Sequence, residues 1–139
     1  MPLLLHALRS GEADFVLGSR VRRAQRGALQ PAQRFGNWMT TRVMQALYGV
    51  TVTDLAPFRA IRASLLTRLD MRERTYGWPT EMIVKAAICR ARIAEVDVSY
   101  QPRLSGKSKV SGTVRGSVKA GVVIMRTALT YRNWRPSDA

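Results

Sequence analysis

This chain of 139 residues has little of several residue types on which common functional sites depend. It has one cysteine, Cys89, one histidine, His6, and no Asp-x-Asp sequence. A lone cysteine excludes an internal disulfide and a thiolate metal cluster, and fits a reducing compartment. A lone histidine excludes a histidine metal cluster and a Ser-His-Asp triad within one chain. Cys89 is expected in the core and His6 in a helix, so a functional site is expected among other side chains.

Long hydrophobic runs are also absent. No uninterrupted apolar run is longer than that from Val122 to Met125, which ends at Arg126, whereas a spanning helix needs about 20 apolar residues. The N-terminal Met-Pro-Leu-Leu-Leu-His has no basic segment before it and is too short for a signal peptide. The sequence predicts that any contact with a membrane is peripheral.

Acidic residues are few: 9 against 23 basic residues, which gives a formal charge of +14. Such a balance indicates anionic partners, namely nucleic acid, acidic lipid or a phosphorylated substrate. Of the basic residues 19 are arginine, whose planar fork suits bidentate contacts with phosphate. A compositional bias of the genome would produce the same excess.

The order of patterns predicts one α/β domain. Helices are expected at residues 3–8, 37–48, 63–69 and 79–90, and strands at 13–17 and 92–100, with β-prone pieces at 50–53 and 58–61 and an exposed basic loop at 20–33. Within the strand at 92–100, Glu95 and Asp97 share one face. They either share a cation or form a solvated acidic face, and the solvated face is the favoured interpretation.

The last helix is expected at residues 113–132, with a basic sector beside an apolar one. Arg115, Lys119 and Arg126 form the basic sector, and Val114, Val118, Met125 and Leu129 form the apolar sector. Such an amphipathic helix either packs on the core or lies in a membrane interface among lipid headgroups.

A loop is expected between the strand at 92–100 and the helix at 113–132, and part of it resembles the end of a phosphate-binding P-loop. Ser105-Gly106-Lys107-Ser108 lacks the required earlier glycine, because Gln101 stands there, so it is no Walker motif. Lys107, Ser108 and Lys109 nevertheless offer cations and donors to a phosphate; the alternative is a solvated surface loop. Two acids at element boundaries, Asp54 and Glu81, are candidates for binding or for helix and turn capping.

Five segments, in order, resemble bacterial family 2 glycosyltransferases of the dolichol-phosphate mannosyltransferase type, which act on polyprenyl phosphates. The segments are Gln33-Arg34-Phe35-Gly36-Asn37-Trp38, Leu47-Tyr48-Gly49-Val50 with Thr53-Asp54, Phe58-Arg59-Ala60-Ile61-Arg62, Tyr76-Gly77-Trp78-Pro79-Thr80-Glu81-Met82, and Ser108-Lys109-Val110-Ser111-Gly112. The earlier Asp14-Phe15-Val16-Leu17-Gly18-Ser19-Arg20 fits the same family. The resemblance spans most of the chain, from about Asp14 to Arg132.

The resemblance implies part of a GT-A-like α/β sandwich: residues 1–110 as the C-terminal, acceptor-side part of the transferase domain, and 111–139 as an amphipathic helix and tail. In the family, an N-terminal half binds a nucleotide sugar through Asp-x-Asp and a divalent metal, Mg²⁺ or Mn²⁺. This chain shows neither that half nor a cofactor site. We therefore expect it to be inactive alone, as a transferase fragment.

The resemblance also assigns roles. Arg20, Arg34 and Arg59 would bind the acceptor phosphate; Lys107, Ser108 and Lys109 would close over the departing diphosphate; Asp54 and Glu81 match catalytic acids of the acceptor region. A phosphate monoester is mostly dianionic at neutral pH and attacks without a strong base, so positioning is the main task. Ala56 departs from the pattern, because glycine is usual there.

The implied partners are a polyprenyl phosphate lipid and the inner, cytoplasmic face of a membrane. A homo-oligomer or a separate donor-binding chain is a further expectation, since a cut sheet exposes apolar surface and strand edges. The alternatives are a non-catalytic transferase subunit and a basic nucleic-acid-binding protein. Against the nucleic-acid interpretation, the aromatic residues lie in expected helices and strands and form no stacking platform.

Overall fold

A three-stranded mixed sheet forms the centre of the computed structural model, which describes residues 2–21, 23, 31–101 and 114–136. The central strand β1 (Phe15–Ser19) pairs antiparallel with β2 (Arg59–Ile61) and parallel with β3 (Ile93–Asp97). Leu17 lies opposite Arg59 on one side and Glu95 on the other. The carboxyl ends of β1 and β3 therefore lie at the same edge of the sheet.

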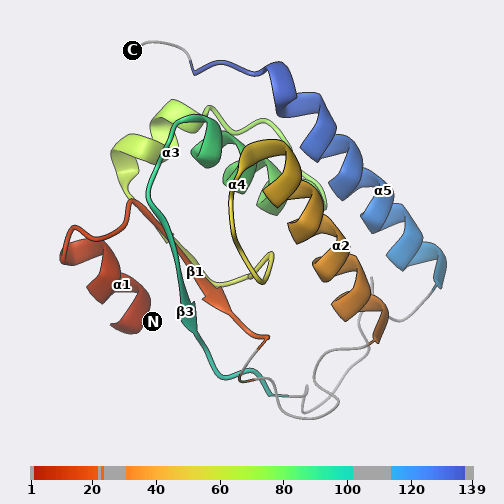
Figure 1. The fold of residues 1–139 in the computed structure, drawn as a ribbon, viewed down its shortest axis with the longest axis horizontal. Coiled ribbons are helices and arrows are strands. Elements are labelled where there is room, and N and C mark those ends of the chain that lie inside the picture. Colours follow the sequence, from red (N-terminus) through yellow and green to blue (C-terminus); the bar gives the residue numbers. More distant parts are fainter. Residues whose placement is uncertain (1, 22, 24–30, 102–113, 137–139) are drawn as a thin grey trace.

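Alternation along β1 divides the core between the two faces of the sheet. Val16 packs with α1 (Pro2–Arg9) through Leu4, whereas Phe15 and Leu17 belong to the larger core on the opposite face. Because β1 is covered on both faces, all its residues are buried, as an apolar run in a central strand predicts. Figure 1 shows α1 alone on one side of the sheet and the longer helices on the other.

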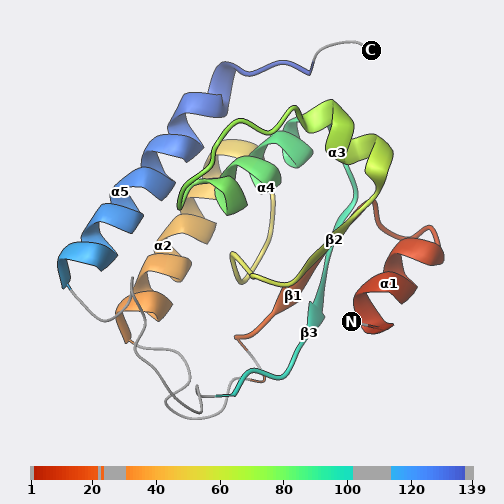
Figure 2. The same cartoon turned by 180° about the vertical axis from the view of Figure 1, so that it is seen from behind.

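Four helices and a short 3₁₀ turn make up the larger side. They are α2 (Pro31–Tyr48), α3 (Ala63–Leu69), α4 (Trp78–Ile88), α5 (Val114–Thr130) and η1 (Tyr131–Asn133). Helices α2 and α5 run side by side, and α5 lies outside α2 and α4, as both views show (Figures 1 and 2). The Tyr48 hydroxyl donates to the Ala128 carbonyl and joins α2 to α5.

The α/β prediction is confirmed, and so are the helix at 63–69, the helix containing Pro79 and both strands. The first strand lies two residues later than predicted, so Gly18 is inside it, and the second is shorter than predicted. The start of α2 is a correction. Proline at the first helical position allows the helix to begin at Pro31, so the predicted loop loses its last residues, Pro31 to Gln33. A second correction concerns residues 50–53, which form no strand; at Thr53 the side chains of Asn37 and Glu95 bind the backbone carbonyl and N–H instead.

The last helix has its predicted extent, and two residues of its expected apolar sector, Val118 and Leu129, are exposed, whereas Met125 is half-buried. Among the described side chains of α5, Thr127 and Ala128 are buried, and their small size lets α5 approach its neighbours. The side chains of Val114 and Arg115 lie outside the described part. Within the described ranges, none of the helices combines the length and the hydrophobicity that a membrane-spanning helix requires.

Candidate functional site

Arg20 follows the last residue of β1, at the edge of the sheet where the parallel strands end. Its backbone N–H donates to Asp54 Oδ2 at 3.0 Å, and its Nε and Nη2 donate to Oδ2 and Oδ1 at 2.7 and 2.8 Å. The Asp54 side chain is 1% exposed and that of Arg20 17%. The sequence nominated both residues, and the structure joins them in one bidentate ion pair.

The electrostatics of this pair favour its charged form. Burial opposes ionisation of Asp54, but the hydrogen bonds and charge of Arg20 outweigh it, so the pKa of Asp54 lies below its usual value. Burial likewise opposes the charge of Arg20, yet Asp54 holds the pKa of Arg20 above its usual value. An ionised Asp54 whose oxygens already accept from Arg20 is poorly placed to take a proton from a substrate.

Arg20 retains donors for a ligand. The Tyr100 ring lies 5.2 Å from the guanidinium carbon and covers one face of the group. Asp54 takes one edge, through Nε and Nη2, and Tyr100 also forms a side-chain hydrogen bond with the guanidinium. Because a guanidinium has five N–H donors, these contacts hold Arg20 in place and leave donors for an anion such as phosphate.

The segment that carries Asp54 is held by two side chains that the sequence did not single out for this role. Glu95, on β3, accepts from the backbone of Thr53 and Asp54, and Asn37, on α2, bonds the backbone of Thr53 and Leu55. The solvated acidic face predicted for Glu95 is therefore wrong. Alternation grouped Glu95 with Ile93 and Asp97, but only the fold shows that Glu95 lies opposite Leu17 and that residues 53 and 54 are bonded to it.

Arg59 is committed to the backbone around it. Its Nε donates to the Ala56 carbonyl at 2.8 Å, Nη1 to the Pro79 carbonyl at 2.8 Å, and Nη2 to the Leu55 carbonyl. Its guanidinium also lies over the Trp78 ring. Burial lowers the pKa of Arg59 to about 10, while Asp54 raises it and Arg20 lowers it. Arg59 thus belongs to the Arg20–Asp54 neighbourhood and ties the 55–56 turn to the start of α4.

Ala56, where the family resemblance leads us to expect glycine, lies in the same turn. Ala56 is buried and has a φ of 23°, in the left-handed region that favours glycine. The carbonyl bond to Arg59 holds the residue in this conformation.

Glu81 lies in a different environment. Its Oε1 lies 2.7 Å from Lys85 Nζ, and both side chains are fully buried. Glu81 also accepts from the backbone N–H groups of Arg72 and Glu73 at 3.0 and 2.7 Å. Burial opposes ionisation, but Lys85 and these N–H groups hold the pKa of Glu81 below its usual value.

The remaining nominated residues lie apart from this pair or outside the described part. Arg34 is exposed on the first turns of α2, and no described interaction joins it to Arg20 or Asp54. Lys107, Ser108 and Lys109 lie outside the described residues. The structure thus brings together Arg20, Asp54 and Arg59, with Tyr100, Glu95 and Asn37 as additional members.

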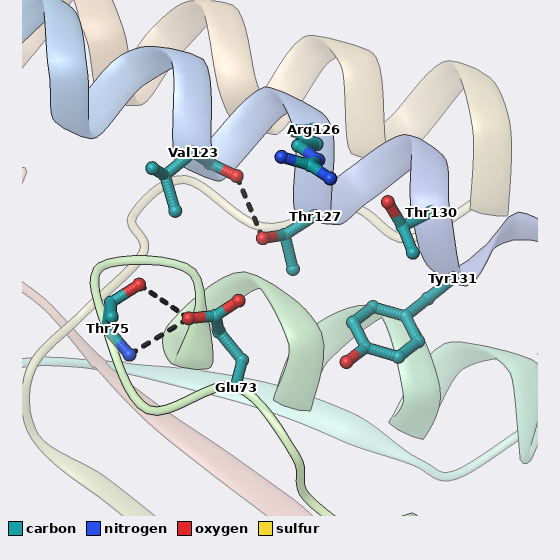
Figure 3. Close-up of a pocket in the computed structure, with 7 residues that line it drawn as sticks. All are labelled: Glu73, Thr75, Val123, Arg126, Thr127, Thr130 and Tyr131. Carbon is teal, nitrogen blue, oxygen red and sulfur yellow. Dashed lines mark hydrogen bonds between the residues drawn. The ribbon is translucent and has the colours of Figure 1, made fainter.

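A pocket of about 410 Å³ lies elsewhere, between α5 and the segment before α4 (Figure 3). It is lined by Glu73, Thr75, Val123, Arg126, Thr127, Thr130 and Tyr131. Glu73 faces Thr75, which donates to it through its N–H and hydroxyl at 2.9 and 2.5 Å. Arg126, a member of the basic sector expected on the last helix, is among the residues that line this pocket.

Comparison with known proteins links the chain to sugar transferases. It is 40% identical to an uncharacterized glycosyltransferase of Mycobacterium tuberculosis over 86% of its own length and 54% of the relative's. It is 32% identical to an undecaprenyl-phosphate mannosyltransferase of Micrococcus luteus, with 95% and 55% covered. It is 29% identical to a dolichyl-phosphate hexose transferase of Haloferax volcanii, with 95% and 56% covered.

The chain therefore spans about half the length of the curated relatives it matches. No family profile matches it, and no solved structure does. The names of these relatives support a relationship to polyprenyl-phosphate glycosyltransferases.

Proposed function

We propose that this chain is the acceptor-side part of a family 2 glycosyltransferase of the GT-A type, which moves a sugar from a nucleotide sugar to a polyprenyl phosphate. The observation that carries the proposal is Arg20, held by Asp54 at the end of β1 with part of its guanidinium uncommitted. Two relatives are named for transfer to undecaprenyl or dolichyl phosphate, which is the chemistry that this arginine suits.

Within this proposal, some of the nominated residues bind phosphate, whereas others position them or support the fold. Arg20 binds the acceptor phosphate directly; Arg34, Lys107 and Lys109 supply further cations, and Ser108 a hydroxyl donor, to phosphate groups. Arg59 acts mainly through the backbone it holds, because all three of its nitrogens bond carbonyls. Asp54 orients Arg20, and Glu81 supports the fold, so neither acts as a base.

Binding of geranyl phosphate, a short soluble polyprenyl phosphate, tests this site. We expect saturable binding by calorimetry, no binding of geraniol, and strong weakening by Arg20→Ala but not by Arg68→Ala, on α3. Equal binding of the phosphate by wild type and Arg20→Ala would contradict the proposal. Tighter binding of RNA than of geranyl phosphate, abolished by salt, would favour the nucleic-acid alternative instead.

The outward faces of α2 and α5 favour a peripheral contact with an anionic membrane surface. Phe35 and Trp38 on α2, and Val118 and Val122 on α5, are exposed by 55–62%. The exposed side chains Arg42, Lys119 and Arg126 accompany them, and neither helix contains an acid. Aromatic and aliphatic side chains among cations are typical of helices that lie among lipid headgroups.

The position of this face agrees with the acceptor site. Figure 1 shows the first turns of α2 and α5 at the same end of the molecule as the end of β1, which Arg20 follows. A polyprenyl phosphate has its phosphate at the membrane surface, so this end would meet it. We place the protein at the inner, cytoplasmic face, where anionic lipid is abundant.

Vesicle sedimentation tests this contact. We expect binding to phosphatidylglycerol vesicles, weak binding to phosphatidylcholine vesicles, and a loss of binding in Trp38→Ala with Val122→Ser. Leu66→Ser, an exposed apolar residue of α3, is the control. If both variants bound as wild type does, α2 and α5 would not form the contact.

The donor side belongs to a further part of the complete enzyme, either in a longer chain or in a partner chain. That part would bring the nucleotide-sugar site and its Mg²⁺ or Mn²⁺. We expect no sugar transfer by the 139-residue chain alone, and self-association through the open sheet edges. Turnover by the purified chain, or a monomer by light scattering, would contradict these expectations.

A further inference from the structure

Asp54 lies in a short segment that is bonded to side chains of two other elements. The segment, Thr53 to Leu55, is not part of a helix or strand. Its backbone N–H groups are satisfied by the side chains of Glu95, on β3, and Asn37, on α2. The direction of the Asp54 carboxylate therefore depends on side chains that do not themselves contact Arg20.

Glu95 uses both carboxylate oxygens on this segment. Oε1 accepts from the N–H groups of Thr53 and Asp54 at 2.9 and 3.2 Å. Oε2 accepts from the Thr53 hydroxyl at 2.9 Å, and that hydroxyl also lies 2.8 Å from Ser19 Oγ, at the end of β1. Glu95 thus fixes the segment relative to the strand that leads into Arg20.

Asn37 holds the segment on either side of Asp54. Its Nδ2 donates to the Thr53 carbonyl at 2.7 Å, and its Oδ1 accepts from the Leu55 N–H at 2.8 Å. One amide thereby pairs with the residues before and after Asp54, as a neighbouring strand would. With its backbone held at three consecutive residues, Asp54 has little freedom to turn away from Arg20.

We propose that Glu95 and Asn37 are positioning residues for the acceptor phosphate, acting through Asp54 on Arg20. This inference rests on the proposed function, because it assumes that Arg20 binds the phosphate. In this proposal Glu95 strengthens the binding of the phosphate, although its negative charge by itself would weaken it. A carboxylate near a phosphate site weakens anion binding by repulsion, whereas a carboxylate that orients the phosphate-binding arginine strengthens it.

The sign of one substitution separates these two effects. Glu95→Gln removes the charge and keeps the shape, but replaces one acceptor by a donor facing Thr53. We expect geranyl phosphate to bind about 10-fold more weakly, in the range of couplings within one hydrogen-bond network. Glu12→Gln, at an exposed residue before the opposite end of β1, makes the same charge change and should not weaken binding. Unchanged or tighter binding by Glu95→Gln would overturn the proposal.

A double-mutant cycle tests whether Glu95 acts through Arg20. In an Arg20→Ala background, Glu95→Gln should weaken the residual binding no further. A weakening as large as in the wild-type background would show that Glu95 acts by another route. Asn37→Asp, which keeps the acceptor but loses the donor to Thr53, should behave like Glu95→Gln, with exposed Asn133→Asp as its control.

A readout without ligand keeps this inference distinct from the proposed function. The Arg20 Nε–H resonance in ¹⁵N NMR reports the bond to Asp54. We expect it to shift and broaden in Glu95→Gln and Asn37→Asp, and to stay unchanged in both controls. If wild type failed to bind geranyl phosphate but this resonance responded, the proposed function would fail while the positioning of Arg20 stood. An unresponsive resonance would overturn the positioning itself.

Discussion

The two acids nominated from the sequence, Asp54 and Glu81, each form an ion pair. The two pairs differ in how many hydrogen-bond donors of the cation are already used. In the closed pair, Lys85–Glu81, the Lys85 ammonium donates to Glu81 and to the carbonyls of Leu69 and Asp70 at 2.7–2.8 Å. The Tyr131 and Trp134 rings lie over it, at 4.6 and 4.8 Å. An ammonium has three N–H donors, and all are used.

In the open pair, Arg20–Asp54, the carboxylate is as deeply buried as Glu81, but the cation reaches the surface. Arg20 has five N–H donors, of which Asp54 takes those on one edge. A buried acid with a buried, saturated cation ties elements together, here α4 to η1 and to the end of α3. A buried acid with a partly exposed cation leaves the cation oriented for a ligand.

Lys85→Met gives the largest effect expected on folding, because it leaves Glu81 charged and buried without its partner. The free energy of unfolding should fall by about 3–5 kcal/mol, measured by urea denaturation. Lys119→Met, at an exposed lysine of α5, is the matched control and should change stability little. A loss of less than about 1 kcal/mol would mean that the closed pair contributes little to the stability of the fold.

Acid should weaken both pairs. The folded-state pKa values of Asp54 and Glu81 lie below their usual values of 3.8 and 4.5. Their contribution to stability is therefore complete above those usual values and is lost as the pH falls through the lower folded-state values. We expect urea midpoints to drop below about pH 4. In Glu81→Gln, the urea midpoint should depend less on pH in this acid range. An unchanged pH dependence would mean that other groups cause the acid sensitivity.

Gly77→Ala tests the packing beside the closed pair. A Cβ at Gly77, which precedes α4, would lie 2.2 Å from Thr127 Oγ1 and 2.9 Å from Glu73 Cγ. Overpacking of this kind costs about 1–3 kcal/mol. Gly36→Ala is the control, because its Cβ meets no atom within 4 Å on α2, and a helical alanine should stabilise by about 1 kcal/mol. Equal thermal midpoints would contradict the packing of α5 on α4.

Arg20→Lys separates binding from folding at the open pair. It keeps the charge near Asp54 but loses the bidentate geometry, so we expect a small loss of stability, about 1 kcal/mol. Binding of geranyl phosphate should weaken more, by about 10-fold. If stability fell strongly while binding held, Arg20 would belong with the closed pair.

An exposed ion pair should have the smallest effect. Arg72 Nη2 lies 2.8 Å from Asp70 Oδ2, with both side chains mostly in solvent. Such pairs contribute little, because water competes for both groups. Arg72→Ala should leave the urea midpoint unchanged within error. A clear decrease in the urea midpoint would contradict the expectation that an ion pair contributes less to stability the more it is exposed to solvent.

Local patterns predicted much of this molecule because they depend on neighbouring residues. Pro79 and the apolar spacing after it placed α4, and the buried run before Arg20 placed β1. The helix at 113–132 was also placed correctly, but the sequence left open whether its apolar sector packs on the core or faces a membrane. Spacing identifies which residues share a helix face, whereas only packing against α2 and α4 decides which face is buried.

The sequence by itself determined the α/β class, the basic balance and the nomination of Arg20, Asp54, Arg59 and Glu81. The tertiary structure decided what these residues do to one another. It joined Arg20 to Asp54 across 34 positions of sequence and Thr53 to Glu95 across 42. It also enclosed Glu81 with a saturated lysine. Local periodicity carries no information about such contacts, because loop closure between distant segments is set by the packing of the whole chain.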